Sequence, residues 1–74
     1  MWKDAKTEKP ETKPSNDYNK SKLVVGLFQN ELFVVEYNWG LDEITKEKWE
    51  QWYSPQYQDE VQVEKWADVI PKLP

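Results

Sequence analysis

The chain has 74 residues and a formal net charge of −4, with ten lysines, fourteen acidic side chains and no arginine, histidine or cysteine. The usual general base, the thiolate nucleophile and the commonest metal ligands are therefore missing, so we expect no enzyme and no bound cofactor or metal. Direct nucleic-acid binding is also disfavoured, because such proteins are normally basic and read bases with arginine. The longest apolar run covers only residues 23–28, far short of the roughly 20 residues of a membrane helix. With no secretion signal at the start, we expect a cytoplasmic protein that does not contact a membrane.

Residues 1–22 are strongly polar and contain Pro10 and Pro14, which favour extended backbone before them. We expect one small domain over residues 1–74, with an extended N-terminal arm at 1–22 and a sheet core at 23–74. Trp2 is expected to anchor the arm to the core, and a frayed terminus is the alternative.

Residues 23–29 and 31–37 are rich in Val, Leu, Phe and Tyr, which predicts two strands of an antiparallel hairpin. Asn30 lies at the turn between them and tolerates the positive φ that tight turns require. Period-2 alternation places Phe33, Val35, Tyr37 and Trp39 on one face, with Leu32 and Val34 on the other, and we expect each face to be covered near the tip. Gly26 predicts a bulge or a bulky neighbour such as a tryptophan.

The remainder of the chain is less regular. We expect a short helical turn near residues 42–47, an extended segment over 49–53, and a turn over 54–60. A strand over 61–70 changes phase at Glu64–Lys65, which predicts a bulge there, and Pro71 ends it. The expected fold is α+β and mostly β: a small antiparallel meander of three to four strands, with at most one short helix and a long N-terminal arm.

Several short motifs occur in the order of a known family: Trp2, Pro10, Val24–Val25, Tyr37–Trp39, Trp52–Tyr53 and the closing VEKWADVIPKLP. This pattern resembles a family of short phage and prophage proteins known as domain of unknown function 551, whose members open on a sequence such as W-I-S-V-x-x-x-L-P and close on V-T-H-W-M-P-L-P-E-P-P. Here three residues, ADV, separate Trp66 from Ile70, and Lys65 stands where the family has histidine. The resemblance implies a small sheet-based fold and a mobile-element origin, and it implies no activity.

The closing stretch suggests that the two ends of the chain meet. We expect Trp66 to enter the core from a last strand and the tail from Ile70 to run along the domain near Trp2. The alternative is an exposed surface of proline and aromatic residues for a partner.

Aromatic and acidic residues are concentrated between positions 47 and 57, and we expect the partner-binding residues there: Trp49, Trp52, Tyr53 and Tyr57, with Glu47 and Glu50. Aromatic residues are enriched at protein interfaces, but they also fill the cores of small domains, and some bind carbohydrates or nucleotides. The carboxylate pair Asp59–Glu60 is best interpreted as solvated surface charge, with a metal-dependent enzyme as the alternative.

These observations favour a non-enzymatic protein-interaction module encoded by a phage or other mobile element. We expect it to bind an unidentified bacterial protein through an acidic aromatic surface, as a monomer or an edge-paired homodimer. The alternative is an acidic nucleic-acid mimic that inhibits a host defence protein.

Overall fold

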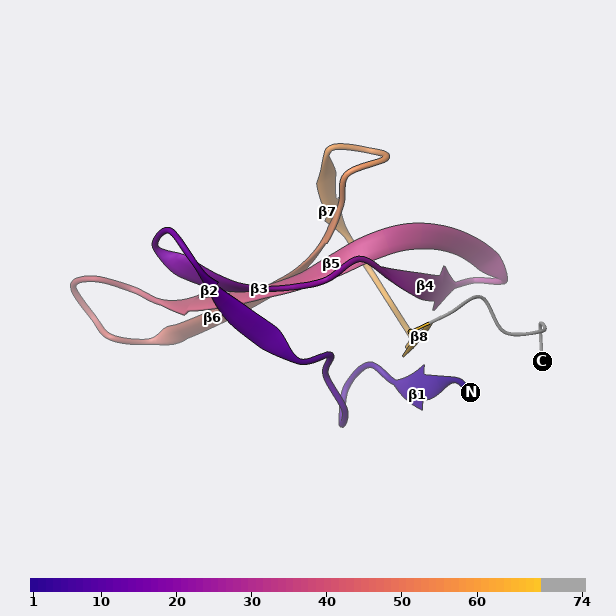
Figure 1. Cartoon of the computed structure of the whole chain (residues 1–74), viewed down its shortest axis with the longest axis horizontal. Helices are drawn as coiled ribbons and strands as arrows, with labels where there is room; N and C mark the ends of the chain where they lie inside the picture. The colour runs from indigo at the N-terminus through magenta and orange to yellow at the C-terminus, as the bar shows by residue number, and fades with distance from the viewer. Residues whose placement is uncertain (69–74) are drawn as a thin grey trace.

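The computed structural model describes residues 1–68, which form eight antiparallel strands (Figure 1). The strands are β1 (Lys3–Asp4), β2 (Thr12–Ser15), β3 (Tyr18–Ser21), β4 (Val24–Phe28), β5 (Glu31–Leu41), β6 (Lys48–Ser54), β7 (Asp59–Val61) and β8 (Lys65–Ala67). The expected mostly-β, antiparallel architecture is confirmed. The expected three to four strands are too few, and no helix is present within residues 1–68. Accordingly, this range holds no helix long and apolar enough to cross a membrane.

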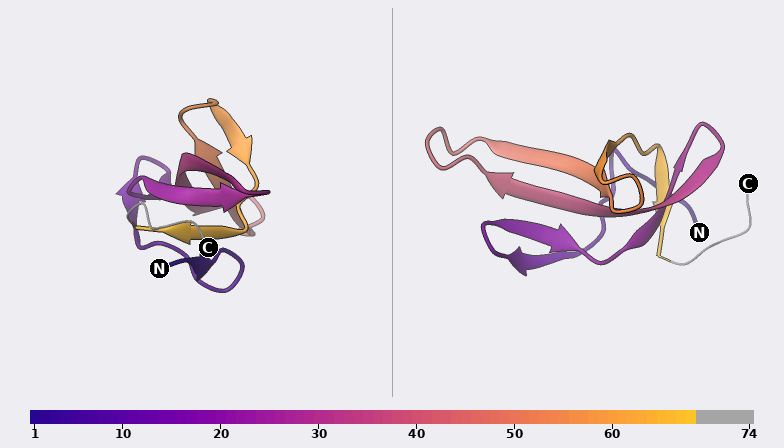
Figure 2. Two further views of the ribbon diagram at one scale, coloured as in Figure 1. Left: turned by 90° about the vertical axis from the view of Figure 1, so that its right-hand side faces the viewer. Right: turned by 90° about the horizontal axis from the view of Figure 1, so that it is seen from above.

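The long strand β5 organises the fold because it belongs to two sheets (Figures 1 and 2). Its first half pairs with β4, which pairs in turn with β8 and then β1. Its second half pairs with β6 on one edge and β3 on the other, and these pair with β7 and β2. The result is a curled sheet in which one strand joins an apolar region to a polar one.

The β4–β5 hairpin confirms the predicted turn. Gln29 and Asn30 both have positive φ, 49° and 65°, and Phe28 pairs directly with Glu31, as in a two-residue turn of the primed type. Gly26 is not a bulge. Trp66 lies directly opposite it on β8, as the expected bulky neighbour, but the atoms nearest to a Cβ at this position would belong to Val35 and Val63. A Cβ atom at Gly26 would lie 3.1 Å from Cγ2 of Val35, so the valine that packs over this position leaves little room for a side chain.

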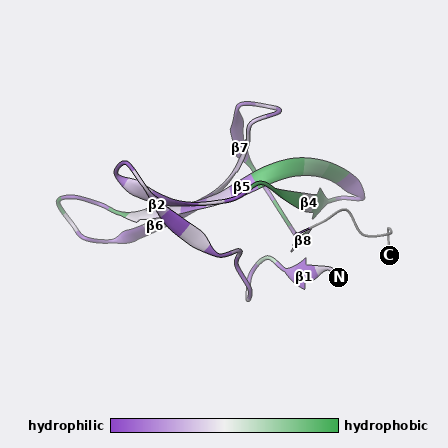
Figure 3. Cartoon of the chain, in the orientation of Figure 1, coloured by the Kyte–Doolittle hydropathy of each residue, from purple (hydrophilic) through white to green (hydrophobic). Residues whose placement is uncertain are grey.

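The core lies between β4, the first half of β5 and β8. The hydropathy is highest along β4 and the first half of β5 (Figure 3). The buried members of the core are Ala5, Val24, Phe33, Val35 and Trp66. The other face of the hairpin is not covered by described residues as we expected, since Leu32 and Val34 remain 39% and 43% exposed.

Trp66 joins the two ends of the described chain. Its side chain is 2% exposed, and its indole Nε1 donates a hydrogen bond to the Glu8 carbonyl at 2.7 Å. Its strand pairs with β1, where Lys3 is opposite Trp66. This part of the expected contact between the chain ends is confirmed, and the tail expected from Ile70 lies outside the described residues. Trp2 is partly buried, and its indole Nε1 has no hydrogen-bond partner among residues 1–68.

The N-terminal segment is not simply an extended arm. Residues 12–21 form the β2–β3 hairpin, whose tight turn has Asn16 at φ 51°. Asn19 and Lys20 pair with Trp39 and Asn38 of β5, so this hairpin is part of the sheet. The sequence conceals it because neither strand alternates apolar and polar residues.

The expected helical turn near 42–47 is present as a single turn in the loop between β5 and β6, and it does not continue into a helix. Asp42 organises it: its carbonyl accepts a hydrogen bond from the Lys46 amide at 2.9 Å, and its carboxylate accepts two more from Ile44 and Thr45 at 2.9 and 3.0 Å. These amide donors lower the pKa of Asp42. The Asp42 carboxylate accepts these hydrogen bonds as the N-cap residue of a helix would, but the chain turns back into β6 before a helix forms.

The predicted change of phase at Glu64 is a break between two strands rather than a bulge. β7 ends at Val61 and β8 begins at Lys65. Between them the Glu64 amide donates to the Leu27 carbonyl at 2.9 Å. The chain crosses here from the sheet of β6 to the sheet of β4.

Candidate functional site

The pairing of β5 with β6 divides the predicted partner-binding residues between two faces. Trp49 and Tyr53 lie opposite Gly40 and Glu36 on one face. Trp52 and Glu50 lie opposite Tyr37 and Trp39 on the other, as the period of two in a strand requires. The six residues therefore do not form a single patch.

Trp52 and Glu50 contact Tyr37 on the second face. The rings of Tyr37 and Trp52 are 5.2 Å apart at 52°, and the Tyr37 hydroxyl donates a hydrogen bond to the Glu50 carboxylate. Burial, together with that carboxylate, raises the pKa of Tyr37 well above its usual range. Trp52 also packs against the core, so these residues support the sheet.

Tyr57 and Glu47 lie apart from both groups. Tyr57 belongs to the turn after β6, where its ring is 57% exposed and contacts Phe33 with centroids 6.3 Å apart. Glu47 lies at the end of the β5–β6 loop, and its carbonyl accepts a hydrogen bond from the Asp42 amide at 2.9 Å. Of the predicted set, Trp49 and Tyr53 line a common hollow, whereas Trp52 and Glu50 meet at Tyr37 on the opposite face.

The hollow that Trp49 and Tyr53 share has a volume of about 360 Å³ and lies on the face formed by β3, β5 and β6. We call it the polar–aromatic hollow, and its lining residues are Tyr18, Lys20, Glu36, Asn38, Trp49, Gln51 and Tyr53. Trp49 lies over Gly40: a Cβ atom there would be only 2.7 Å from Cζ2 of the indole. Tyr18 contacts the same indole, with ring centroids 6.1 Å apart. Trp49 nevertheless remains 38% exposed, which leaves part of its ring free for a ligand.

Buried polar side chains lie within this hollow. Glu36 is 6% exposed and Asn38 is 3% exposed. With its amide oriented to match its neighbours, Asn38 donates to Glu36 Oε2 at 3.0 Å. Lys20 Nζ lies 3.8 Å from the same oxygen, which is an ion pair but too long for a good hydrogen bond. A carboxylate in a hollow with aromatic walls can accept hydrogen bonds from a cationic group that enters the hollow.

The sequence analysis missed Tyr18, Lys20, Glu36 and Asn38 as members of the site. Glu36 and Asn38 carry a signal, because they alternate with the apolar residues of the same predicted strand. Tyr18 and Lys20 could be placed only with the β2–β3 hairpin in hand. Within residues 1–68, no group of three or more acidic side chains is arranged to hold a metal ion.

No protein-family model matches the chain, and no similar curated protein or solved structure is found. The resemblance to domain of unknown function 551 therefore remains an expectation based on the motifs of the sequence.

Proposed function

We propose that the chain is a non-enzymatic interaction module that binds a bacterial protein through the polar–aromatic hollow. The observation that supports this most strongly is that one hollow is lined by both the partly exposed Trp49 indole and the buried carboxylate of Glu36. Concave sites with aromatic walls and a few convergent polar groups are typical of ligand recognition. Of the residues expected from the sequence, Trp49 and Tyr53 keep this role, and the other four do not line the hollow.

The chemistry of the hollow favours an arginine or lysine side chain of the partner. The guanidinium or ammonium group would donate to Glu36 in place of the long contact from Lys20. Tyr53, which is directly opposite Glu36, and Trp49 provide aromatic walls for the rest of the side chain. The distribution of charge along the chain supports this choice, because residues 23–74 carry ten acidic side chains and four lysines. Such an electrostatic field attracts a basic partner.

We further propose that the module acts as a monomer in the bacterial cytoplasm and that a mobile element encodes it. The monomer is supported by the outer strands. β2 carries Lys13 and Pro14, and β7 carries Asp59 and Glu60, and charge and proline on edge strands oppose pairing between copies. The mobile-element origin is supported only by the sequence motifs around Trp2 and Trp66.

The experiment is affinity capture from a nuclease-treated bacterial lysate with the wild-type chain and matched variants. Glu36→Gln keeps the shape of the side chain and removes its charge, and Trp49→Ala removes the aromatic wall. Tyr57→Ala is the control, since Tyr57 is exposed outside the hollow. We expect one partner that is retained by the control and lost by the other two variants, each shown to be folded by near-ultraviolet circular dichroism.

Two outcomes would contradict the proposal. If Glu36→Gln and Trp49→Ala capture the same partner as the wild type, the hollow is not the binding surface. If capture is insensitive to the hollow variants and disappears steeply with added salt, the acidic-mimic alternative is favoured instead.

A further inference from the structure

A larger cleft of about 690 Å³ lies between the N-terminal segment, the β2–β3 hairpin and β8. Half of all the lysines in the chain line it: Lys3, Lys9, Lys13, Lys20 and Lys22. The acidic side chains that line it are Glu8, Glu11 and Asp68. The lining thus has a formal charge of +2 in a chain of net charge −4, and we call it the lysine cleft.

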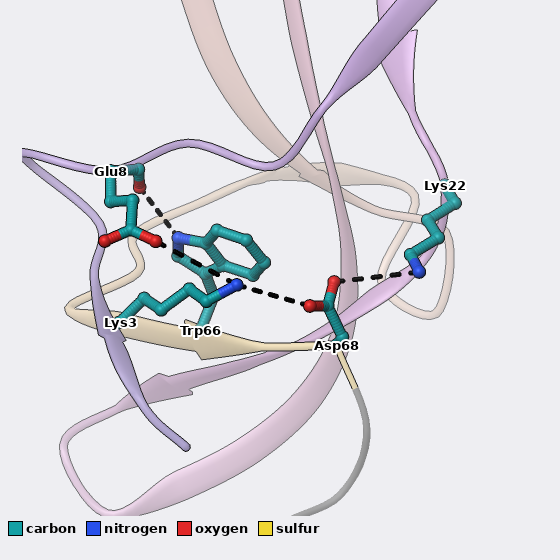
Figure 4. Close-up of polar contacts among 5 residues, drawn as sticks. All are labelled: Lys3, Glu8, Lys22, Trp66 and Asp68. Carbon is teal, nitrogen blue, oxygen red and sulfur yellow. Dashed lines mark hydrogen bonds and ion pairs between the residues drawn. The ribbon is translucent and has the colours of Figure 1, made fainter.

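One end of the cleft already holds an anionic group between two lysines (Figure 4). The Asp68 carboxylate lies 3.3 Å from Lys3 Nζ and 3.7 Å from Lys22 Nζ. Lys3 also lies over the Trp66 ring, 4.5 Å from its centroid, which fixes the position of its ammonium group. Two ammonium groups therefore converge on one carboxylate, and they lower its pKa.

In a second pair of lysines, only one of the two has an anionic partner among the described residues. Lys13 and Lys20 are directly opposite each other on β2 and β3, an arrangement that is destabilising for like charges. The contact of Lys20 with Glu36 is long, at 3.8 Å. Among the described residues, no carboxylate lies within ion-pairing distance of Lys13. This repulsion is relieved if an anion binds between the two ammonium groups.

We propose that the lysine cleft binds a phosphate dianion, free or as the phosphomonoester of a small molecule, between Lys13 and Lys20. The excess of two positive charges matches the charge of one phosphate group near neutral pH. Lysine suits this ligand as a point charge, without the paired geometry of arginine. The cleft volume is within the range of small-molecule sites, which leaves room for an organic portion next to the phosphate. This site is separate from the proposed partner surface, although Lys20 lines both.

The test is a titration of the full chain with inorganic phosphate, starting from a phosphate-free buffer. Binding is monitored by the NMR chemical shifts of the backbone amides. A second titration uses adenosine monophosphate, and sodium acetate at equal ionic strength is the control anion. We expect phosphate to shift amides in residues 12–22 and acetate to leave them unchanged. Tighter binding of the nucleotide would assign the site to phosphomonoesters, and equal or weaker binding would assign it to free phosphate.

Charge-matched variants decide the role of the lysines. We expect Lys13→Gln with Lys20→Gln to weaken phosphate binding about tenfold, because charge-assisted contacts are lost. Lys46→Gln with Lys65→Gln removes the same charge outside the cleft and should change affinity by less than about twofold. Asp68→Asn should strengthen binding about threefold, because it releases Lys3 and Lys22.

The proposal is overturned if phosphate and acetate give the same shifts, or if both double variants lose affinity equally. Should the Lys13 and Lys20 double variant fail to fold, Asp68→Asn decides: stronger phosphate binding supports the cleft, and unchanged or weaker binding overturns it. Capture of a protein partner through Glu36 and Trp49 is measured independently, so either proposal can fail alone.

Discussion

Replacing Gly40 by alanine should displace the Trp49 indole without altering any group that contacts a partner directly. Gly40 lies within β5 and does not have positive φ, so its backbone accepts an alanine. The added methyl carbon would, however, lie 2.7 Å from Cζ2 and 2.8 Å from Cε2 of Trp49. Nonbonded carbon atoms do not pack that closely, so the indole ring must move outward.

The expected cost follows from the exposure of Trp49. Overpacking typically costs about 1–3 kcal/mol, and a ring that is 38% exposed can rotate toward solvent, so we expect about 1 kcal/mol. In a Trp49→Ala background the methyl group meets no indole. There the substitution should stabilise the chain by about 0.5 kcal/mol, because glycine weakens a strand relative to alanine. The predicted coupling energy between the two positions is therefore about 1.5 kcal/mol.

The assay is urea unfolding of the wild type, the two single variants and the double variant. The indole N–H resonance of Trp49 reports the position of the ring, and partner capture reports its effect on binding. Free energies of unfolding that add within about 0.5 kcal/mol would refute the proposed packing of Trp49 on Gly40. A Gly40→Ala variant that keeps full capture with a displaced indole would separate Trp49 from recognition.

Three further predictions test the parts of the fold that support the site. Trp66→Phe loses the indole hydrogen bond to the Glu8 carbonyl and should cost about 1–2 kcal/mol in urea unfolding, whereas retention of full stability would contradict it. Ser54→Ala should cost about 1–2 kcal/mol, since Ser54 is fully buried and donates to the Val34 carbonyl at 3.1 Å. Ser15→Ala is the control, since Ser15 is a strand serine that is only partly buried. The pKa of Asp42 is lowered in the folded chain. The stabilisation from its loop contacts is therefore fully present at pH values above the ordinary carboxyl pKa of about 3.9, and it is lost as the pH falls through the folded pKa. An NMR titration giving a pKa at or above the ordinary value would contradict this.

The sequence predicts the apolar half of the fold better than the polar half. The hairpin of residues 23–37 was predicted because its turn residues and β-branched composition agree. The β2–β3 hairpin was not, because the pairing with β5 imposes strand structure on segments such as TKPS and YNKS. The Asn16–Asp17 turn was its only local signal.

The candidate sites follow the same pattern: most of their aromatic residues could be predicted from the sequence, and most of their polar residues could not. Trp49 and Tyr53, which line the hollow, were predicted as site residues because aromatic residues stand out in the sequence. Trp52 and Glu50 were grouped with them although strand periodicity separates the two pairs. The lysine cleft was missed, although six of the ten lysines precede residue 23. A net charge for the whole chain conceals this asymmetry, and only the fold shows that five of those lysines line one cleft.

The central claim is that the polar–aromatic hollow recognises a basic side chain, and the most direct measurement is an NMR titration with a capped arginine peptide. We predict shifts of the Trp49 indole N–H and of the side-chain amides of Asn38 and Gln51, which line the hollow. Glu36→Gln should abolish these shifts while the capped alanine peptide produces none. Shifts spread over the exposed carboxylates, or unchanged shifts in Glu36→Gln, would contradict the assignment of the hollow as the recognition site.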